Sequence, residues 1–343
     1  MRVLITGGSG LIGRRLVRRL LEAGARPVVV SRRADDARGK PESRGVEFVQ
    51  GDVETAGRWQ AAVDGCDAIV NLAGHNLFAE RWNGEIKRKI RDSRVHGTDN
   101  LVSAIAAAGN RPQVLVQGSA VGYYGPRGDE ELDESAPAGS DFLADVCREW
   151  EEASEPVETL GVRRAVIRTG IVLAPGEGAL KTMTPIFKLL PGAPVGGNGW
   201  LAPARGRQWL SWIHADDIAG LFHLAIDNPE AVGPINGTAP KPVRNAEFAR
   251  ALSRTLWKPY APWRFFIPFG PPDALLRAAL GEIAEVIAKG QRAVPTKALA
   301  LGYQFRHPDL SAALKVIFAE DSKRKDEAKS STEAAQPREP AGN

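Results

Sequence analysis

Apolar residues in the first half of the chain follow two alternating spacings. Residues 3–6 form a short continuous apolar run that is typical of a buried strand. Residues 11–23 carry Leu16, Val17 and Leu20 on one helical stripe, and Gly24 ends that pattern. The same alternation predicts strands over residues 27–30, 46–50, 68–72, 114–117 and 164–168, and helices over residues 83–108 and 142–160.

This order of elements predicts the fold class. When strands alternate with helices, neighbouring strands run parallel and right-handed crossovers place helices on both faces of the sheet. The expected strands are continuous runs rich in Val, Ile and Leu, which fits strands covered on both sides. The sequence therefore predicts an α/β fold with a doubly wound parallel sheet of the Rossmann type.

The pattern changes near Leu173. Gly and Pro become frequent over residues 191–206, and the expected elements become short, which predicts a smaller C-terminal lobe on the substrate side of the sheet. We place a nucleotide-binding domain at residues 1–240, with this lobe beginning near residue 173, and a small C-terminal domain at residues 260–318. Residues 320–343 hold almost no large apolar side chain, so we expect a disordered tail there.

Composition and charge narrow the classes of function. The 343 residues are 43% hydrophobic without an apolar run that could span a bilayer, and no signal-peptide pattern opens the chain, so we expect a cytoplasmic protein. The net charge of +4 is spread along the chain and interrupted by acidic runs, which favours a small-molecule substrate over nucleic acid or a membrane. Cys66, Cys147 and the scattered histidines lack the spacing of metal ligands, so we expect no metal site.

The strongest chemical signal is the glycine turn between the first strand and the first helix. Gly7, Gly10 and Gly13 lie at the spacing that dinucleotide-binding folds use. The first permits a tight turn, the second lets the backbone approach a pyrophosphate, and the third lets the helix pack closely on the sheet. The amide end of the helix, with Leu11 and Ile12, then faces the phosphates. The alternative is a tight turn with no ligand.

The end of the second strand predicts which dinucleotide binds. NAD-binding folds carry an acidic residue about 20 positions after the glycine turn for the ribose 2′-hydroxyl, whereas a nearby Arg accepts a 2′-phosphate. This chain has Ser31, Arg32 and Arg33 there and no acid. A guanidinium matches a phosphate and a hydroxyl adds a hydrogen bond, so we predict NADP(H) as the cofactor. Alternatively, these arginines are ordinary solvated charges.

Other expected cofactor contacts follow later strands. Asp52 and Val53 come after the third strand, near the expected adenine edge, and the fourth strand leads into Leu72, Ala73 and Gly74, whose small residues would let the cofactor cross the backbone. A plain turn would explain either segment taken alone. We also include Ile171, after the sixth strand, among the expected cofactor contacts.

Several further motifs carry a family resemblance. They are Asn-Leu-Ala-Gly at 71–74, Gly-Thr-x-Asn-Leu at 97–101, Ser-Ala-Val-Gly-Tyr-Tyr-Gly at 119–125, Asp-Phe-Leu-Ala-x-x-Cys-x-x-Trp-Glu at 141–151, Ser-Trp-Ile-His at 211–214, Asn-Gly-Thr-Ala-Pro at 236–240 and Gly-Gln-Arg-x-x-Pro at 290–295. Together with the glycine turn they resemble the extended short-chain dehydrogenase/reductases that include sugar-nucleotide epimerases, and more closely an atypical, epimerase-like branch. The resemblance covers about residues 1–318 and implies an NAD-dependent epimerase/dehydratase fold with a small C-terminal domain.

The chain departs from the superfamily at the catalytic dyad. Active members use Tyr-x-x-x-Lys, and the matching positions here are Leu143 and Cys147, or Phe142 and Val146 one residue earlier. The resemblance implies that this loss is typical of the atypical branch. It also implies that Arg94 stands at the usual Asn position and contacts the cofactor, whereas the alternative is that Arg94 only pairs with a carboxylate.

The remaining candidates for catalysis lie close to these positions. The resemblance retains the upstream serine as Ser119, and Tyr123 and Tyr124 follow it, so we predict Ser119, Tyr124 and Cys147 as catalytic residues. Aromatic packing is the alternative for the tyrosines, and burial as a small apolar residue is the alternative for Cys147. The chain is therefore expected to be an oxidoreductase or epimerase acting by hydride transfer on a small carbonyl or alcohol, or else a non-catalytic NADPH sensor.

The second lobe holds one more polar cluster. Trp209, Trp212, His214 and Asp217 follow the glycine-rich segment, and the resemblance places them beside the substrate cleft. A lone histidine after an apolar run is more often structural than catalytic, so we expect His214 to be structural. Residues 200–207 are extra relative to the branch, which alters the mouth of the expected cleft.

Overall fold

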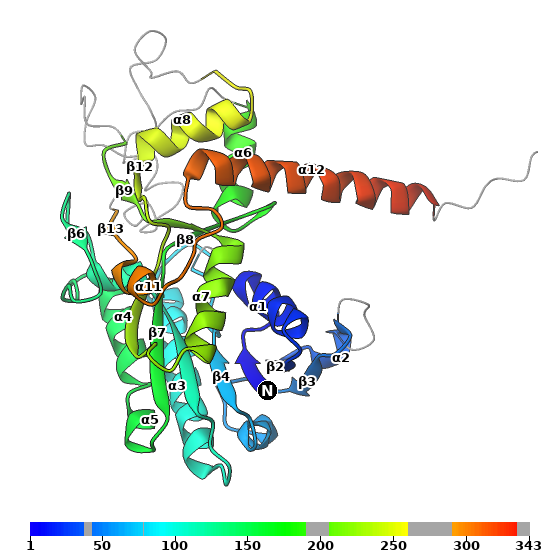
Figure 1. The fold of residues 1–343 in the computed structure, drawn as a ribbon, viewed down its shortest axis with the longest axis vertical. Helices are drawn as coiled ribbons and strands as arrows, with labels where there is room; N and C mark the ends of the chain where they lie inside the picture. Colours follow the sequence, from blue (N-terminus) through cyan, green and yellow to red (C-terminus); the bar gives the residue numbers. More distant parts are fainter. Residues whose placement is uncertain (38–42, 78, 190–205, 260–289, 335–343) are drawn as a thin grey trace, which may run out of the picture.

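A computed structural model describes residues 1–37, 43–77, 79–189, 206–259 and 290–334 (Figure 1). Its centre is a seven-stranded parallel sheet in the order β11-β7-β5-β4-β1-β2-β3. The strands are β1 (Arg2–Thr6), β2 (Arg26–Ser31), β3 (Glu47–Gln50), β4 (Ala68–Asn71), β5 (Val114–Ala120), β7 (Arg163–Thr169) and β11 (Gly233–Gly237). The expected doubly wound parallel sheet is confirmed.

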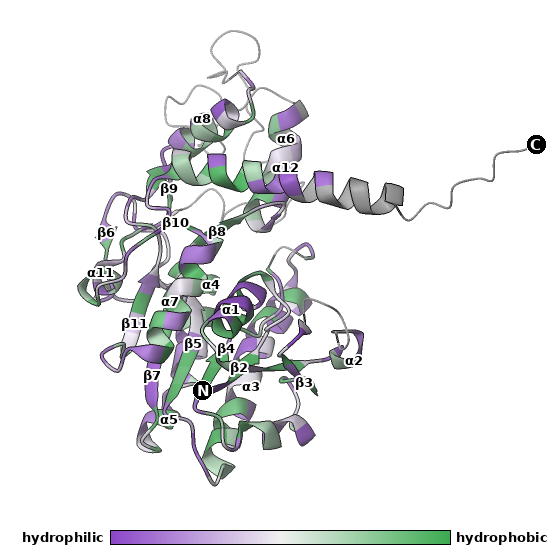
Figure 2. Cartoon of the chain, turned by 45° about the vertical axis from the view of Figure 1, so that its right-hand side comes forward, coloured by the Kyte–Doolittle hydropathy of each residue, from purple (hydrophilic) through white to green (hydrophobic). Residues whose placement is uncertain are grey.

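Helices cover both faces of this sheet. One face carries α1 (Leu11–Glu22) and α7 (Ala215–Asp227), and the other carries η2 (Arg58–Val63), α3 (Gly84–Ala107), α4 (Phe142–Glu152) and α5 (Pro156–Thr159). Residues of β1 alternate between the two sides: Val3 and Ile5 pack into the α1 and α7 layer, and Leu4 packs into the opposite layer. Figure 2 shows the strands as largely hydrophobic segments between these layers.

The chain reverses its direction of winding between β1 and β4. From β1 it moves outward to β2 and β3, and it then crosses back to β4 on the other side of β1. In open α/β sheets, ligands bind at this switch point, beyond the carboxyl ends of the strands. The fold therefore places the glycine turn after β1 next to the loop after β4.

A second lobe lies beyond the strand ends. It contains β8 (Ile171–Ala174) paired with β10 (Trp212–His214), β9 (Trp209–Leu210) paired with β12 (Val243–Arg244), and β6 (Glu131–Leu132) paired with β13 (Arg292–Ala293). Its helices are α6 (Gly178–Leu189), α8 (Asn245–Thr255) and α12 (Leu310–Ala334). Two further helices belong with the main sheet: α11 (Thr296–Ala300) packs against β11, and α2 (Ala34–Ala37) follows β2. Trp212, Phe248 and Leu314 belong to the separate apolar core that holds α6, α8 and α12 together.

Two elements differ from the sequence expectations. The helix expected over residues 142–160 is divided into α4 and α5, and Pro156 begins α5, a position where proline fits because its missing N–H is not needed. The seventh strand, β11, contains Pro234, which hid its strand pattern but is tolerated in an edge strand. Residues 260–289 of the expected small C-terminal domain lie outside the described residues, as does most of the 200–207 segment.

The expected disordered tail is instead helical as far as Ala334. The first turns of α12 bury Leu310, Leu314 and Ile317 against the second lobe. A helix that is already nucleated extends easily through residues such as Ala, Glu and Lys, which have high helix propensity. In Figure 1, the later turns of α12 project away from the rest of the chain.

Candidate functional site

The turn after β1 has room only for backbone. Gly7 has a φ of +68°, and a Cβ added there would lie 2.6 Å from the carbonyl carbon of Leu72. A Cβ on Gly13 would lie 2.5 Å from the carbonyl oxygen of Gly7, and one on Gly10 would lie 3.2 Å from the same atom. Gly13 thus allows close contact between the first turn of α1 and the backbone of the glycine turn, rather than between the helix and the sheet as expected. These glycines bring the backbone close to the space above the strand ends.

The amide end of α1 is open toward that space. Its N-cap residue is Gly10, and no side chain caps the first turn. The unpaired N–H groups of a first turn and the helix dipole attract an anion such as a phosphate. Leu11 lies at the turn before α6, 3.3 Å from where a Cβ on Gly178 would lie, and Ile12 packs against the core. The second lobe therefore approaches the site at the start of α1.

Side chains of Ser31 and Gln50 hold the backbone of the turn after β2, and its two arginines are exposed at the surface. The hydroxyl of Ser31 accepts the N–H of Arg33 at 3.1 Å. The amide of Gln50 donates to the carbonyl of Arg32 at 2.7 Å and accepts the N–H of Ala34 at 3.0 Å. The Arg32 side chain is 74% exposed. This geometry can present a hydroxyl and two guanidinium groups to a phosphate, and Gln50 is a positioning residue that the sequence pattern did not single out.

Asp52 and Val53 border the same turn from β3. The Asp52 carboxylate lies 3.9 Å from the guanidinium of Arg32, an exposed pair that water screens. Val53 packs at 3.4 Å from the position of a Cβ on Gly97 of α3, and its carbonyl accepts from Asn100. Asp52 therefore faces the turn, whereas Val53 joins α3 to the edge of the sheet.

A buried hydrogen-bond network holds the loop after β4. Thr6 donates to the side-chain oxygen of Asn71 at 2.5 Å and accepts the N–H of Ala73 at 3.3 Å. The side-chain amide of Asn71 donates to Thr98 at 2.9 Å and to Gln117 at 3.0 Å. Four elements thus fix the path of residues 72–74 next to the glycine turn.

Arg94 lies against that loop. Its guanidinium carbon is 3.0 Å from where a Cβ on Gly74 would lie and 5.0 Å from the centre of the Trp150 ring. The guanidinium donates to the carbonyls of His75 and Ile90, at 3.1 and 2.9 Å. Burial lowers the pKa of Arg94, and the neighbouring Cys147 acts in the opposite direction. In the described part of the chain, no carboxylate pairs with Arg94, which favours the cofactor contact over the ion-pair alternative.

The α4 helix brings Cys147 to Ser119. A Cβ on Gly122 would lie 3.5 Å from Leu143 and 3.8 Å from the Cys147 sulfur, so both positions that the resemblance assigns to the missing dyad face the segment that follows β5. Cys147 is 5% exposed, and burial raises its pKa to about 12, with Glu151 adding to the effect. The thiol is therefore neutral at physiological pH and contributes no charge to the site.

The Ser119 hydroxyl is engaged by a buried ion pair. It donates to one oxygen of Glu151 at 2.6 Å. Arg168, at the end of β7, donates to both oxygens of the same carboxylate, each at 2.9 Å. Both side chains of this pair are at least nine-tenths buried. Glu151 and Arg168 were not among the candidate site residues predicted from the sequence. A charged residue directly after the apolar run 165–167 could have indicated that Arg168 has a buried partner.

Tyr124 is part of the same network. Its side chain is fully buried, and its hydroxyl donates to Asn236 at 2.7 Å and accepts from Arg168 at 3.1 Å. Burial raises the pKa of Tyr124 to about 12, against the opposing effect of Arg168. These contacts give its phenol a structural role and leave no hydrogen-bonding position facing a substrate.

Ile171 lies in the second lobe, at the start of β8. It is 38% exposed, and its N–H donates to the carbonyl of Ser211 at 2.7 Å. The main sheet and its loops bring together the glycine turn, residues 31–33, residues 72–74 and Arg94. Ile171 approaches them only through the turn that leads from β8 to α6.

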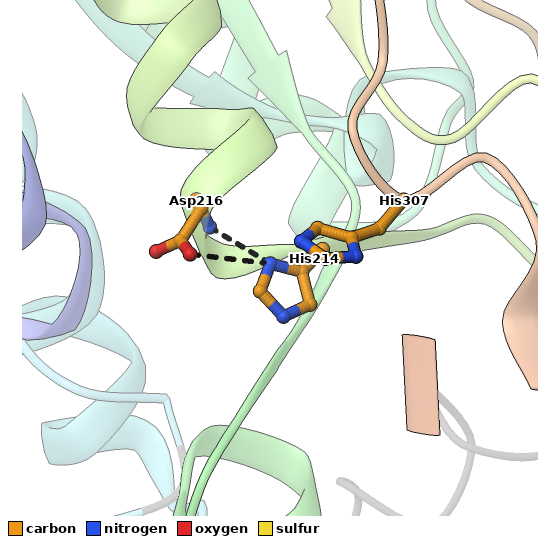
Figure 3. Close-up of side chains that lie close together, drawn as sticks. All are labelled: His214, Asp216 and His307. Carbon is orange, nitrogen blue, oxygen red and sulfur yellow. Dashed lines mark hydrogen bonds and ion pairs between the residues drawn. The ribbon is translucent and has the colours of Figure 1, made fainter. Parts of the chain in front are cut away.

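Among the described residues, one cluster of possible metal ligands lies where α7 begins (Figure 3). One ligand atom from each of His214, Asp216 and His307 lies within 4.8 Å of the others. However, Nδ1 of His214 accepts the N–H of Asp216 at 3.1 Å, and the His214 and His307 rings stack with centres 3.8 Å apart. Asp216 also lies 3.6 Å from Arg15 and 3.7 Å from Arg18. The occupied Nδ1 and the nearby cations do not favour a metal ion here, and the His214 side chain caps α7.

The buried side chain of His214, next to His307, predicts that the stability of the fold depends on pH. Burial lowers the pKa of His214 to about 4, and the adjacent His307 adds to this effect. Between the unfolded value near 6.5 and pH 4, the unfolded chain binds a proton that the folded chain does not, so the free energy of unfolding decreases as the pH falls. We expect a loss of about 3 kcal/mol across this range, measured by urea unfolding.

A matched variant isolates this effect. In His214→Asn the side chain can still cap α7 but does not titrate, so the acid-induced loss should become smaller. An unchanged loss in the variant would mean that other groups cause it.

The geometry of the glycine turn and the neighbouring loops agrees with the family comparison. A model of the NAD dependent epimerase/dehydratase family matches residues 3–236, more than half of the chain. The chain belongs to the NAD dependent epimerase/dehydratase family. The expected resemblance is therefore confirmed, and a second model, of the domain of unknown function DUF1731, matches residues 271–317.

Relatives in this epimerase family match along nearly the whole chain. The chloroplastic SDR39U1 homolog of Arabidopsis thaliana is 40% identical over 319 residues, covering 92% of this chain and 86% of that protein. YfhF of Bacillus subtilis is 34% identical and covers 93% of this chain and 99% of its own length. The crystal structure of human SDR39U1 isoform 2 with NADPH is 33% identical, with a TM-score of 0.77, covering 92% of this chain and 99% of that chain.

More distant members of the fold agree in architecture. A UDP-glucose 4-epimerase from Thermus thermophilus, solved with NAD, has a TM-score of 0.72 at 21% identity and covers 94% of this chain and 99% of its own chain. At this identity the likeness shows the Rossmann-type fold alone. Among the described residues, none of the helices is long and apolar enough to cross a membrane.

Proposed function

We propose that this epimerase-family chain binds NADPH and transfers hydride between that cofactor and a small carbonyl or alcohol substrate. The observation that carries the proposal is the cradle formed by Gly7, Gly10 and Gly13 at the uncapped start of α1, where side chains would collide with backbone. The NADPH in the crystal structure of human SDR39U1 supports the same cofactor. When bound, the cofactor supplies the hydride.

The residues of this chain have distinct roles in the proposal. The α1 amides bind the diphosphate, and Ser31, Arg32 and Arg33 bind the 2′-phosphate. Arg94 supplies a permanent positive charge close to Cys147, which occupies the position of the missing lysine. Arg94 on α3 thus supplies a positive charge that holds the cofactor ribose or phosphates.

A second candidate function is a non-catalytic NADPH sensor. The observation that favours it is the state of the three predicted catalytic residues. Ser119 donates to Glu151, Tyr124 is fully buried with its hydroxyl bonded, and Cys147 is a buried neutral thiol. A panel of aldehydes, ketones and quinones, followed through the NADPH absorbance, separates the two functions, because a sensor binds NADPH without consuming it.

Cofactor preference is tested at Arg32. Arg32→Asp should weaken NADPH binding by roughly one to three kcal/mol, because a charge-assisted hydrogen bond to the 2′-phosphate is replaced by repulsion, and should leave NADH binding nearly unchanged. Fluorescence titration of both cofactors measures this. Arg26→Asp, which changes an exposed arginine at the opposite end of β2, is the control and should leave both affinities intact. Tighter binding of NADH than NADPH by the original chain would contradict the assignment.

A further inference from the structure

Two adjacent tyrosines of η3 (Val121–Tyr124) have opposite environments. Tyr124 is fully buried and doubly hydrogen-bonded, whereas Tyr123 is half-buried. In the described part of the chain, the Tyr123 hydroxyl makes no hydrogen bond to another residue. Its ring packs edge-to-face on Tyr124, with centres 5.4 Å apart. As far as the described residues go, the Tyr123 hydroxyl is therefore available to a ligand.

The η3 segment lies next to the residues that the resemblance places at the catalytic site. η3 continues directly from β5, whose last residues include Ser119, and it packs against α4. Gly122, next to Tyr123, faces Leu143 and Cys147, the two positions where the superfamily carries its Tyr and Lys. Tyr123 on η3 is therefore adjacent in sequence to the residue that faces the α4 position where the superfamily carries its tyrosine.

A buried cation accompanies Tyr123. The guanidinium carbon of Arg168 lies 3.4 Å from the centre of the Tyr123 ring. Glu151 holds that guanidinium by two hydrogen bonds of 2.9 Å, so its plane is fixed against the phenol. In the usual dyad a lysine brings positive charge to the catalytic tyrosine. Here an arginine from β7 brings a permanent charge to a tyrosine from η3.

We propose that Tyr123 is the proton donor of this site, with Arg168 as its positioning residue. This inference rests on the proposed NADPH-dependent function. As the hydride supplied by bound NADPH reaches the substrate carbonyl carbon, the carbonyl oxygen takes the hydrogen from the Tyr123 hydroxyl, yielding the alcohol, NADP⁺ and a phenolate. Water then returns a proton to the phenolate. The reverse reaction removes the alcohol proton by the same route.

Nitration with tetranitromethane tests the placement without a known substrate. In the full chain, peptide mapping should show nitration of Tyr123 but not of buried Tyr124, and saturating NADPH should reduce the Tyr123 rate at least several-fold. A rate that NADPH leaves unchanged would overturn the proposal. Failure of the original chain to bind NADPH in the titration above would instead overturn the proposed function itself.

The paired variants Tyr123→Phe and Tyr303→Phe test the chemistry. On the carbonyls that the original chain reduces, Tyr123→Phe should bind NADPH normally but lose at least about a hundredfold in turnover, as expected for a missing general acid. Tyr303→Phe removes a hydroxyl that donates to the carbonyl of Asp217 at 2.9 Å, so it should lower the melting temperature and retain turnover once corrected for the folded fraction. Turnover of Tyr123→Phe within a few-fold of the original would overturn the proposal. If no carbonyl is reduced, the nitration result decides whether Tyr123 lines the cofactor site.

Discussion

The Gly7→Ala variant should lose measurable NADPH binding and a substantial part of its stability. The backbone at Gly7 has a φ of +68°, which costs a residue with a side chain about 1–2 kcal/mol. The new methyl group would also lie 2.6 Å from both the carbonyl carbon and the oxygen of Leu72, and these atoms belong to the loop fixed by Asn71. The turn must therefore move, and the amides of α1 move with it. Thermal unfolding and fluorescence titration with NADPH measure the two losses.

Gly24→Ala is the matched control for this variant. Gly24 ends α1 with a φ of +75°, but a Cβ there meets nothing within 4 Å. It should cost only the conformational term of about 1 kcal/mol and leave NADPH affinity unchanged. If both variants lose stability equally and both bind NADPH, then the contact between Gly7 and the β4 loop is unimportant for the cradle.

The fold could be predicted largely from the sequence because its strands are buried on both faces. Such strands read as continuous apolar runs, and the helices between them have a clear periodicity. Prediction failed where local signals conflict with tertiary packing. Pro234 obscured an edge strand, and the polar later turns of α12 gave no sign that its packed first turns would extend them into a helix.

Candidate residues for the cofactor side of the site could likewise be proposed from the sequence, because glycines and strand-end arginines act through local backbone geometry. The environments of the candidate catalytic residues could not be predicted in this way. The difference between Tyr123 and Tyr124 arises from Asn236 and Arg168, which are distant in sequence and meet only when β7 and β11 pair beside β5. Tyr123 and Tyr124 are neighbours on a short 3₁₀ helix. Such a helix is too short to show a hydrophobic periodicity, so the sequence does not indicate which of the two phenols is buried. Long-range ion pairs such as that between Glu151 and Arg168 are hidden from sequence patterns for the same reason.

Arg168→Met should destabilise the chain by about 3–5 kcal/mol, the second large effect that the structure predicts. Removal of one partner of a buried ion pair leaves the other charge without compensation. Here Glu151, about 8% exposed, would keep only the hydrogen bond from Ser119, and the Tyr124 hydroxyl would lose a donor. Urea unfolding measures the change.

Arg164→Met, on the same strand, is the control. Arg164 pairs with Glu155 and Glu158, whose side chains are 59% and 50% exposed, so both carboxylates return to water and the loss should stay near 1 kcal/mol. The double variant Arg168→Met with Glu151→Leu separates charge from packing. Since it buries no lone charge, it should recover most of the stability that Arg168→Met loses. On the proposed mechanism, both variants should reduce carbonyls poorly, because Tyr123 lacks the Arg168 cation in each. Recovery of both stability and turnover would mean that Arg168 serves only the core.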